Sequence, residues 1–313
     1  MDVTFARHVW RSGLGGLLIA AGVAAVVLVA CGTTASRGGP SPTSPGVLRA
    51  VATTTVLGDI VRNVGGDRMT IASIIPAGAG PEDYEPKPDD ARRLAGADLI
   101  VSNGLGLDDF LDRLVAAAGA ESAQRLVLGD GVPTISVNGL KNPHVWLDPS
   151  LVVGYYLPAI AASLSAIDPA GAATYAANRA AYTTKVEAMD AANIAKIKTI
   201  PAANRKLVTF HDAFPYFAAH YDFELVGVIL VNVGQEPNAA DLAALVETVR
   251  SAKVPAVFSE AQFSPGLVRT LADEAGIRRV VATLYTDTVG PPPTDTYLTM
   301  MAWNVDQIVE ALR

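Results

Sequence analysis

Cysteine is almost absent from this chain of 313 residues, which contains only Cys31. A single cysteine cannot form a disulfide within the chain, so a scaffold held together by disulfides is excluded. The chain also lacks the G-x-S-x-G sequence of the serine hydrolases that use a nucleophile elbow. With its one cysteine close to the N-terminus, the sequence does not indicate an acyl-transfer enzyme.

Positive charge is scarce as well. The 24 Lys and Arg residues are outnumbered by 31 Asp and Glu residues, which gives a formal net charge of −7, and no Lys/Arg-rich run occurs. A protein that binds nucleic acid neutralises phosphates with basic side chains, so this class of partner is excluded. No G-x-x-x-x-G-K-[ST] sequence is present, and an ATPase activity would therefore belong to another polypeptide.

The N-terminal segment has the pattern of an export signal. Arg7 and Arg11 precede an almost continuously apolar stretch at 14–29, which ends in the sequence LVAC at Cys31. This ending resembles a bacterial lipobox, in which the cysteine receives a lipid and becomes the first residue of the mature protein. The alternative is an uncleaved membrane anchor, for which the apolar stretch is somewhat short. In either case the folded part lies outside the cytoplasm and is tethered to a membrane.

Residues 32–46, GTTASRGGPSPTSPG, are rich in Gly, Ser, Thr and Pro and predict a flexible linker. From Val47 onward, short apolar runs typical of strands alternate with amphipathic helical stretches, which indicates parallel sheets buried on both faces. We predict an α/β fold with two doubly wound lobes, at 47–166 and 201–313, joined by a long rigid helix at 167–200. The predicted strands are 47–53, 69–75, 99–103, 132–137, 207–210, 254–259 and 279–284.

The linking helix has a clear start signal. Asp168 is suited to cap the helix and Pro169 to occupy its first position. After Gly171 the chain continues without Gly or Pro as far as Pro201, and Tyr175 begins an apolar stripe. At ~1.5 Å per residue, thirty helical residues span roughly 45 Å, which is long enough to join two lobes. A last helix is predicted from about Thr294 to Arg313.

Ligands of such α/β sheets bind beyond the carboxyl ends of the strands, so polar residues there are candidates for chemistry. Excluding His8, the chain has only three histidines, and two of them, His144 and His211, follow predicted strands in different lobes. We interpret the third, His220, as a solvated surface residue. The motif KNPHVWLDPS by itself favours a structural role for His144, and the placement of both histidines after strands in a histidine-poor chain makes metal ligation an equal alternative. The acidic residues that follow predicted strands are Glu82, Asp83, Glu85 and Asp287.

The order and spacing of several motifs resemble the substrate-binding lipoproteins of bacterial zinc and manganese ABC importers, the metal-binding cluster A-I solute-binding proteins. The resemblance covers essentially all of 47–313. The matching pieces are ATTTVLGDIVRNVGGD, DYEPKPDDARRLAGADLIVSNG, NPHVWLDP, VTFHDAFPYFA, VFSEAQFSPGLVRTLADEAG, YTDT and YLTMMAWNVDQIVEAL. The resemblance implies one divalent metal ion held between two α/β lobes.

Position by position, the resemblance implies four ligands: Glu82, His144, His211 and Asp287. The first departs from the family motif, which has histidine two residues before Tyr-Glu-Pro. Asp83 is an alternative ligand at this place, and a water molecule would complete a site of three residues. A metal-bound histidine usually donates its other N–H to a carboxylate or carbonyl, which makes Glu85 and Glu260 candidates for orienting the imidazoles. The alternative for each is an ordinary hydrogen bond within its loop.

The identity of the metal stays open between Zn²⁺ and Mn²⁺, with Fe²⁺ also compatible with two nitrogen and two oxygen donors. Two histidines with two carboxylates resemble the manganese binders, whereas His211 stands where those proteins usually have glutamate. The family's zinc-specific members often carry a His- and acid-rich loop, and this chain has none.

The resemblance implies a monomeric, non-enzymatic receptor that delivers the metal to a permease and its separate ATPase subunit. Two alternatives use the same residues: an extracytoplasmic metallohydrolase, and an adhesin or surface binding module with a structural metal.

Overall fold

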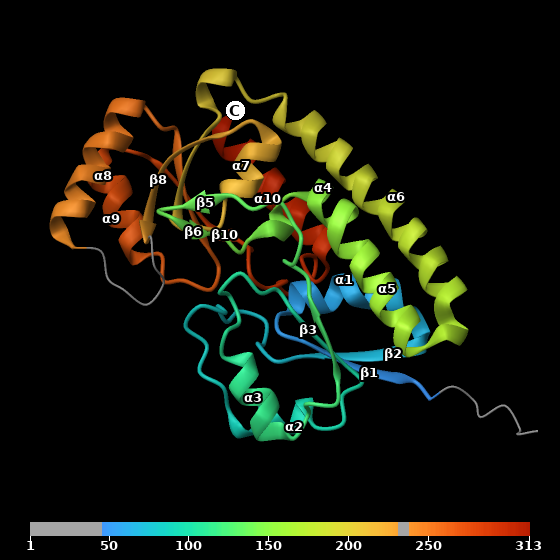
Figure 1. Cartoon of the computed structure of the whole chain (residues 1–313). Helices are drawn as coiled ribbons and strands as arrows, with labels where there is room; N and C mark the ends of the chain where they lie inside the picture. The colour runs from blue at the N-terminus through green and yellow to red at the C-terminus, as the bar shows by residue number, and fades with distance from the viewer. Residues whose placement is uncertain (1–45, 231–237) are drawn as a thin grey trace, which may run out of the picture. The chain divides into compact units, whose positions relative to one another are not determined.

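The computed structural model describes residues 46–230 and 238–313 (Figure 1). The predicted signal peptide at 1–31 and all but the last residue of the predicted linker at 32–46 lie outside the described residues.

The first half of the described chain builds a parallel sheet of four strands in the order β2-β1-β3-β4. Its central strand β1 alternates its side chains between two layers. Ala50 and Ala52 pack into the cluster that contains the helix α1, while Val51 packs into the cluster that contains α2 and α3. The sheet is therefore covered on both faces, as a doubly wound fold requires. The elements are β1 (Leu48–Ala52), α1 (Thr55–Gly65), β2 (Met69–Ser73), α2 (Pro88–Leu94), β3 (Leu99–Ser102), α3 (Leu111–Ala118) and β4 (Gln124–Val127).

The second half contains two parallel strand pairs, β7 with β8 and β9 with β10, and β7 also lies against β9. The helices α8 and α9 pack on these strands through a separate apolar cluster. The elements are β7 (Lys206–His211), α7 (Pro215–Tyr221), β8 (Glu224–Leu230), α8 (Ala239–Ala252), β9 (Ala256–Glu260), α9 (Gly266–Ala275), β10 (Arg279–Leu284) and α10 (Tyr297–Leu312).

Between the halves runs the helix α6 (Ala172–Ile197), whose 26 residues span roughly 39 Å. Asp168 caps the short turn that precedes it, and the same carboxylate binds Arg68 of the first half. The helix packs against α1 and α5 (Leu157–Ile167), which precede it in the sequence, and against α10, which follows it. The predicted linking helix at 167–200 contains this helix.

The segment from α4 (Pro149–Leu151) through the π-helical turn at Val152–Tyr156 to α5 is long and apolar enough to span a membrane. Its buried residues Tyr156, Leu157, Ile160 and Leu164 instead belong to the main apolar cluster, with α1 and α6 against them. It is therefore a core helix of the fold.

The predicted fold class is confirmed, although not every predicted strand exists. Residues 132–137 are not a strand of the sheet, because Pro133 offers no N–H and the N–H of Ile135 donates to the hydroxyl of Tyr216. Only Ser136–Val137 (β5) pairs, in an antiparallel hairpin with Leu140–Lys141 (β6) across an Asn-Gly turn. The prediction missed β4 and β8, since the polar start of β4 and Gly227 within β8 obscure the pattern of a buried strand.

The interpretation of His220 as a solvated surface residue is wrong. Its Nδ1 lies 3.0 Å from Oδ1 of Asp148 and its Nε2 lies 2.9 Å from Oδ1 of Asp190. The side chain is only 15% exposed and joins α7 to α6 and to the residue that caps α4. Burial by itself lowers the pKa of His220, but the two carboxylates raise it to about 9.

We expect the His220→Gln variant to lose about 1.5–3 kcal/mol of unfolding free energy near pH 6, as for hydrogen bonds to charged groups. Because the folded-state pKa is raised, this contribution is complete below about pH 6.5 and disappears as the pH rises through about 9. The difference in unfolding free energy between the wild type and His220→Gln is measured by urea unfolding of the metal-free chain near pH 6 and near pH 10.

A matched control is Lys196→Met on α6, which removes an exposed pair with Asp306 and should change stability by about 1 kcal/mol or less. An equal deficit of His220→Gln at both pH values would contradict the assignment of a charged His220.

Candidate metal centre

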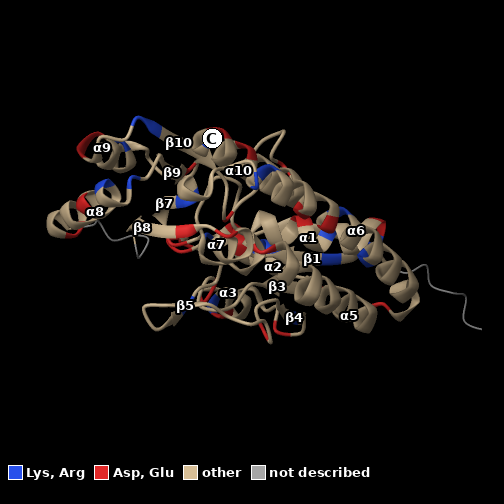
Figure 2. Cartoon of the chain, turned by 90° about the horizontal axis from the view of Figure 1, so that it is seen from above, with Lys and Arg blue, Asp and Glu red and all other residues tan. Residues whose placement is uncertain are grey.

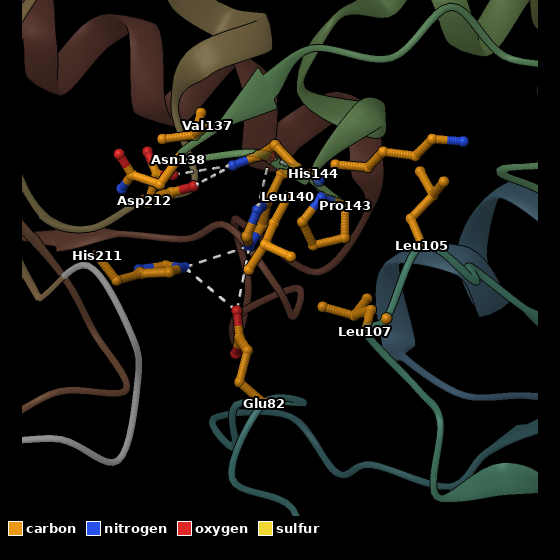
Figure 3. A pocket seen from close by; sticks show the side chains of 13 residues that line it. Glu82, Leu105, Leu107, Val137, Asn138, Leu140, Pro143, His144, His211 and Asp212 are labelled. Carbon is orange, nitrogen blue, oxygen red and sulfur yellow. Dashed lines mark hydrogen bonds and ion pairs between the residues drawn. The ribbon is translucent and has the colours of Figure 1, made fainter.

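Four side chains from distant parts of the chain meet at one place. Glu82 comes from the loop after β2, His144 immediately precedes the turn at Val145–Leu147, His211 is the last residue of β7, and Asp287 follows β10. One ligating atom from each of the four lies within 4.8 Å of the others. Figure 3 shows Glu82, His144 and His211 pointing toward one another. For Glu82, His211 and Asp287 this placement follows from the fold, since residues at the carboxyl ends of parallel strands converge, whereas His144 follows the hairpin of β5 and β6.

The distances between the donor atoms are short. His144 Nε2 lies 3.3 Å from Oε1 of Glu82, 3.2 Å from Oδ1 of Asp287 and 3.3 Å from Nε2 of His211. His211 Nε2 lies 3.8 Å from Oε1 of Glu82 and 3.4 Å from Oδ2 of Asp287. The two Nε2 atoms thus face the same small volume as the two carboxylates.

The structure separates Glu82 from its neighbours in the sequence. Asp83 and Glu85 are exposed and line a different hollow, beside Gly80, Tyr84 and Phe263. Only Glu82 of the three belongs to the group of four. The role of Glu85 as an orienting residue stays a prediction, as does the choice between Glu82 and Asp83 as ligand.

The orientation of His144 is set by Asn142, a residue that the sequence analysis did not single out. Oδ1 of Asn142 lies 3.1 Å from Nδ1 of His144 and also accepts from the backbone N–H of His144. The amide of Asn142 donates to the backbone oxygen of Asp212 in the second half of the chain. Because an amide oxygen only accepts, Nδ1 of His144 carries the proton and Nε2 is left for a ligand. The Asn-Pro-His sequence was the only signal for this contact.

The orientation of His211 is set by the end of β9. Nδ1 of His211 lies 3.1 Å from Oε1 of Glu260, and the ring of Phe263 packs edge-on at a centroid distance of 5.2 Å. Glu260 is fully buried, and neither of its oxygens has a hydrogen bond of good geometry. A buried carboxylate beside Nδ1 favours the proton there and leaves Nε2 facing the group of four. Sequence reasoning named Glu260 as a candidate for such a role, which stays a prediction.

The electrostatics of the group are those of a cation site. Burial raises the pKa of Glu260 and by itself lowers those of both imidazoles. For His144 the nearby carboxylates of Asp287 and Glu82 outweigh burial and raise the pKa. For His211 the charges of Glu260 and Asp287 raise the pKa to about 10. Buried negative charge is costly unless it is paired with a positive group, so three carboxylates around two imidazoles favour a bound cation.

The residues present fit a divalent metal ion. Oδ1 of Asp287 is buried without a hydrogen-bond partner and faces Nε2 of His144. Two imidazole nitrogens with two carboxylate oxygens suit Zn²⁺ and other divalent transition metals. A cavity of about 370 Å³ reaches this place, lined by Glu82, His144 and His211 together with Leu105, Leu107 and Leu140 among others (Figure 3). Glu82, at 21% exposed, is the most accessible of the four.

Hydrogen bonds connect the two halves around the site, and three of them involve the segment that carries Asp287. Thr288 accepts from the backbone N–H of Gly78, in the loop that carries Glu82. The backbone N–H of Val289 donates to the hydroxyl of Thr55, and Nε1 of Trp146 donates to the backbone oxygen of Thr286. The segment that carries Asp287 is thereby bonded to the segments that carry Glu82 and His144.

Comparison with known proteins agrees with this architecture. Residues 50–311 match the family described as the periplasmic component A of the zinc-uptake complex, ZnuA. The chain belongs to this family. The resemblance to metal-importer binding proteins that the motifs indicated is thus confirmed.

Several proteins are similar to this chain along most of their length. The manganese-binding lipoprotein MntA of Halalkalibacterium halodurans is 32% identical over 290 residues, which cover 92% of this chain and 95% of that protein. The manganese ABC transporter substrate-binding lipoprotein PsaA of Streptococcus pneumoniae is 31% identical over 309 residues, which cover 95% and 98%. Among solved structures, the periplasmic zinc-binding protein TroA of Treponema pallidum is 29% identical with a TM-score of 0.78, covering 85% of this chain and 99% of TroA.

We expect His211 of the metal-free chain to titrate near pH 10, which NMR of the imidazole nitrogens can measure. In the Glu260→Gln variant the pKa of His211 should fall, because the charge that favours its protonated form is removed while burial, which lowers the pKa, remains.

Glu274→Gln on the exposed end of α9 is the matched control and should leave the titration unchanged. A His211 pKa that is equal in the wild type and in Glu260→Gln would contradict the assigned contact between the two side chains.

Proposed function

We propose that this protein is an extracytoplasmic receptor that captures one divalent transition-metal ion, Zn²⁺ or Mn²⁺, for import. The observation that carries the proposal is the meeting of Glu82, His144, His211 and Asp287 within 4.8 Å, three of them buried. Its relatives are named as manganese-binding or metal ABC transporter substrate-binding lipoproteins, and TroA as a zinc-binding protein.

The capture mechanism follows from where the four ligands come from. Glu82 and His144 belong to the proposed lobe at 47–166, His211 and Asp287 to the proposed lobe at 201–313, and the linking region at 167–200 joins the lobes. An ion that binds all four bridges the lobes and stabilises their closed arrangement. Release then requires that the lobes are displaced relative to each other, which a membrane partner can drive.

The four donor groups explain both the binding and the release of a divalent ion at this site. Two carboxylates balance the double positive charge, and two neutral imidazoles contribute nitrogen donors. Both imidazoles have raised pKa values in the metal-free chain, so the incoming ion displaces protons. Exposed Glu82, which borders the cavity, is the ligand through which the ion would enter and leave.

The partners that we propose are an ABC permease and its separate ATPase subunit. The relatives named as ABC transporter substrate-binding lipoproteins support this assignment, together with the absence of a P-loop from the sequence. A lipid on Cys31 would anchor the protein to the membrane, with the segment at 32–46 as a flexible tether and the receptor acting as a monomer.

We propose that the protein is not an enzyme. A catalytic zinc site usually has three protein ligands and an open position for water, whereas four protein side chains converge here. We also propose that the ion is not structural, since hydrogen bonds such as that of Trp146 to Thr286 join the two halves independently of the four ligands.

The proposal is tested by titrating the full chain, purified in detergent and stripped of metal, with Zn²⁺ and with Mn²⁺. We expect one ion per chain by calorimetry. His144→Ala should weaken binding by more than the roughly 10–100-fold that loss of an outer partner causes, because it removes a ligand. Glu82→Ala should weaken binding as well, whereas Asp83→Ala should not.

His220→Ala is the matched histidine control, since His220 contacts Asp148 and Asp190 and none of the four ligands. Failure of the wild-type chain to bind either metal would overturn the proposed function. Weakening by Asp83→Ala in place of Glu82→Ala would reassign the first ligand.

A further inference from the structure

The short turn that follows β9 contacts both ligands of the second half of the chain. Glu260, the last residue of β9, lies beside His211, and Phe263 packs on the ring of His211. Between them, Nε2 of Gln262 donates to Oδ2 of Asp287 at 2.7 Å. A single turn of four residues therefore positions His211 and Asp287 together.

The two carboxylate oxygens of Asp287 are not equivalent. Oδ2 accepts two hydrogen bonds, from Gln262 at 2.7 Å and from the hydroxyl of Thr286 at 3.2 Å. Oδ1 is buried, has no hydrogen-bond partner and lies 3.2 Å from Nε2 of His144. Since a carboxylate oxygen offers about two lone-pair sites, Oδ2 is occupied and Oδ1 is free for a metal ion.

A carboxylate with one free oxygen contributes one bond to a metal. The restriction matters because metals differ in the number of donors they require. Zn²⁺ in closed sites is bound by four donors in a tetrahedron, whereas oxygen-rich octahedral sites suit Mn²⁺. Chelation through both oxygens of Asp287 would raise the number of donors, and the hydrogen bonds of Gln262 and Thr286 oppose it.

The spacing of the donors agrees with four-coordination. Ligands at ~2.0–2.1 Å from a tetrahedral Zn²⁺ are about 3.3–3.4 Å from one another. Neighbouring ligands of an octahedral ion at the same distance are only about 2.8–3.0 Å apart. With Oδ1 as the donor of Asp287, the four known separations between donor atoms are 3.2, 3.3, 3.3 and 3.8 Å, and three of these lie close to the tetrahedral value.

We propose that Gln262 is a specificity-determining residue, which keeps Asp287 bound through one oxygen and so favours four-coordinate Zn²⁺ over Mn²⁺. This inference rests on the proposed function, because it concerns the ion held by the same four side chains. Gln262 acts through Asp287 and does not itself touch the metal.

The test uses the full chain in detergent, loaded with Zn²⁺ for X-ray absorption spectroscopy and with Co²⁺ for visible spectroscopy. We expect four nitrogen and oxygen donors around Zn²⁺ and the intense visible bands of tetrahedral Co²⁺. Zn²⁺ and Mn²⁺ affinities are then measured for the wild type and for Gln262→Met, which keeps the length of the side chain and removes its hydrogen bond.

In Gln262→Met the freed Oδ2 can join the metal, so the ratio of Zn²⁺ to Mn²⁺ affinity should fall about 10-fold or more, as for other outer partners. The Co²⁺ bands should weaken at the same time. Thr286→Val removes the second hydrogen bond to the same oxygen with little change of shape, and it should shift the ratio in the same direction. Gln307→Met on α10 is the matched control and should change neither readout.

The outcomes separate this inference from the proposed function. A wild-type chain that binds one ion with five or six donors overturns the restriction by Gln262 and leaves the receptor proposal standing. An unchanged affinity ratio in both Gln262→Met and Thr286→Val also overturns it. A wild-type chain that binds no ion overturns the proposed function itself.

Discussion

The contact of Asp287 with two imidazoles is the interaction on which the rest of the structure depends. Asp287 is fully buried, and burial by itself raises the pKa of its carboxyl group. The neighbouring His211 and His144 reverse the effect and lower that pKa, so the carboxylate stays ionised beside positively charged rings. Glu82 and Glu260 add negative charge to the same place. A buried group of this composition is stable only with protons on its imidazoles or with a cation among its side chains.

The fold is organised to bring these charges together from opposite halves of the chain. Each half is built of parallel strands, and each directs the loops at the carboxyl ends of its strands to the shared site. The helix α6 packs against helices of both halves, and Arg68, Asp168 and Tyr175 join its start to the first sheet. Figure 2 shows Lys and Arg interspersed with Asp and Glu over the described helices and strands. Basic residues are therefore not gathered on one helix or strand among the described residues.

Each ligand candidate has a neighbour that decides how it presents its donor atom. Asn142 contacts Nδ1 of His144, and Glu260 contacts Nδ1 of His211, so that Nε2 of each ring faces the site. Gln262 and Thr286 donate to Oδ2 of Asp287 and leave its Oδ1 free. Glu82 stands apart, because it is partly exposed and borders the cavity. This division suits a receptor in which three donors are held ready and the fourth completes the site. The proposed preference for Zn²⁺ would have its cause in the turn after β9, separate from the identity of the four side chains.

The sequence by itself determined the alternation of strands and helices, the long helix between two α/β halves, and the scarcity of histidine that drew attention to His144 and His211. These features depend on local patterns, such as apolar periodicity, an Asp-Pro helix start and polar residues after strands. Six of the seven predicted strands lie within a few residues of β1, β2, β3, β7, β9 and β10.

Only the tertiary structure decided which side chains face the site, because contacts distant in the sequence set these directions. The loop of Glu82 is held by a bond from Gly78 to Thr288, 210 residues away, and no local pattern separates Glu82 from Asp83. His220 looked like a surface residue at the end of a short helix until folding brought Asp148 and Asp190 to its two ring nitrogens. Gln262 carried no signal at all, since its role exists only where the turn after β9 meets the end of β10.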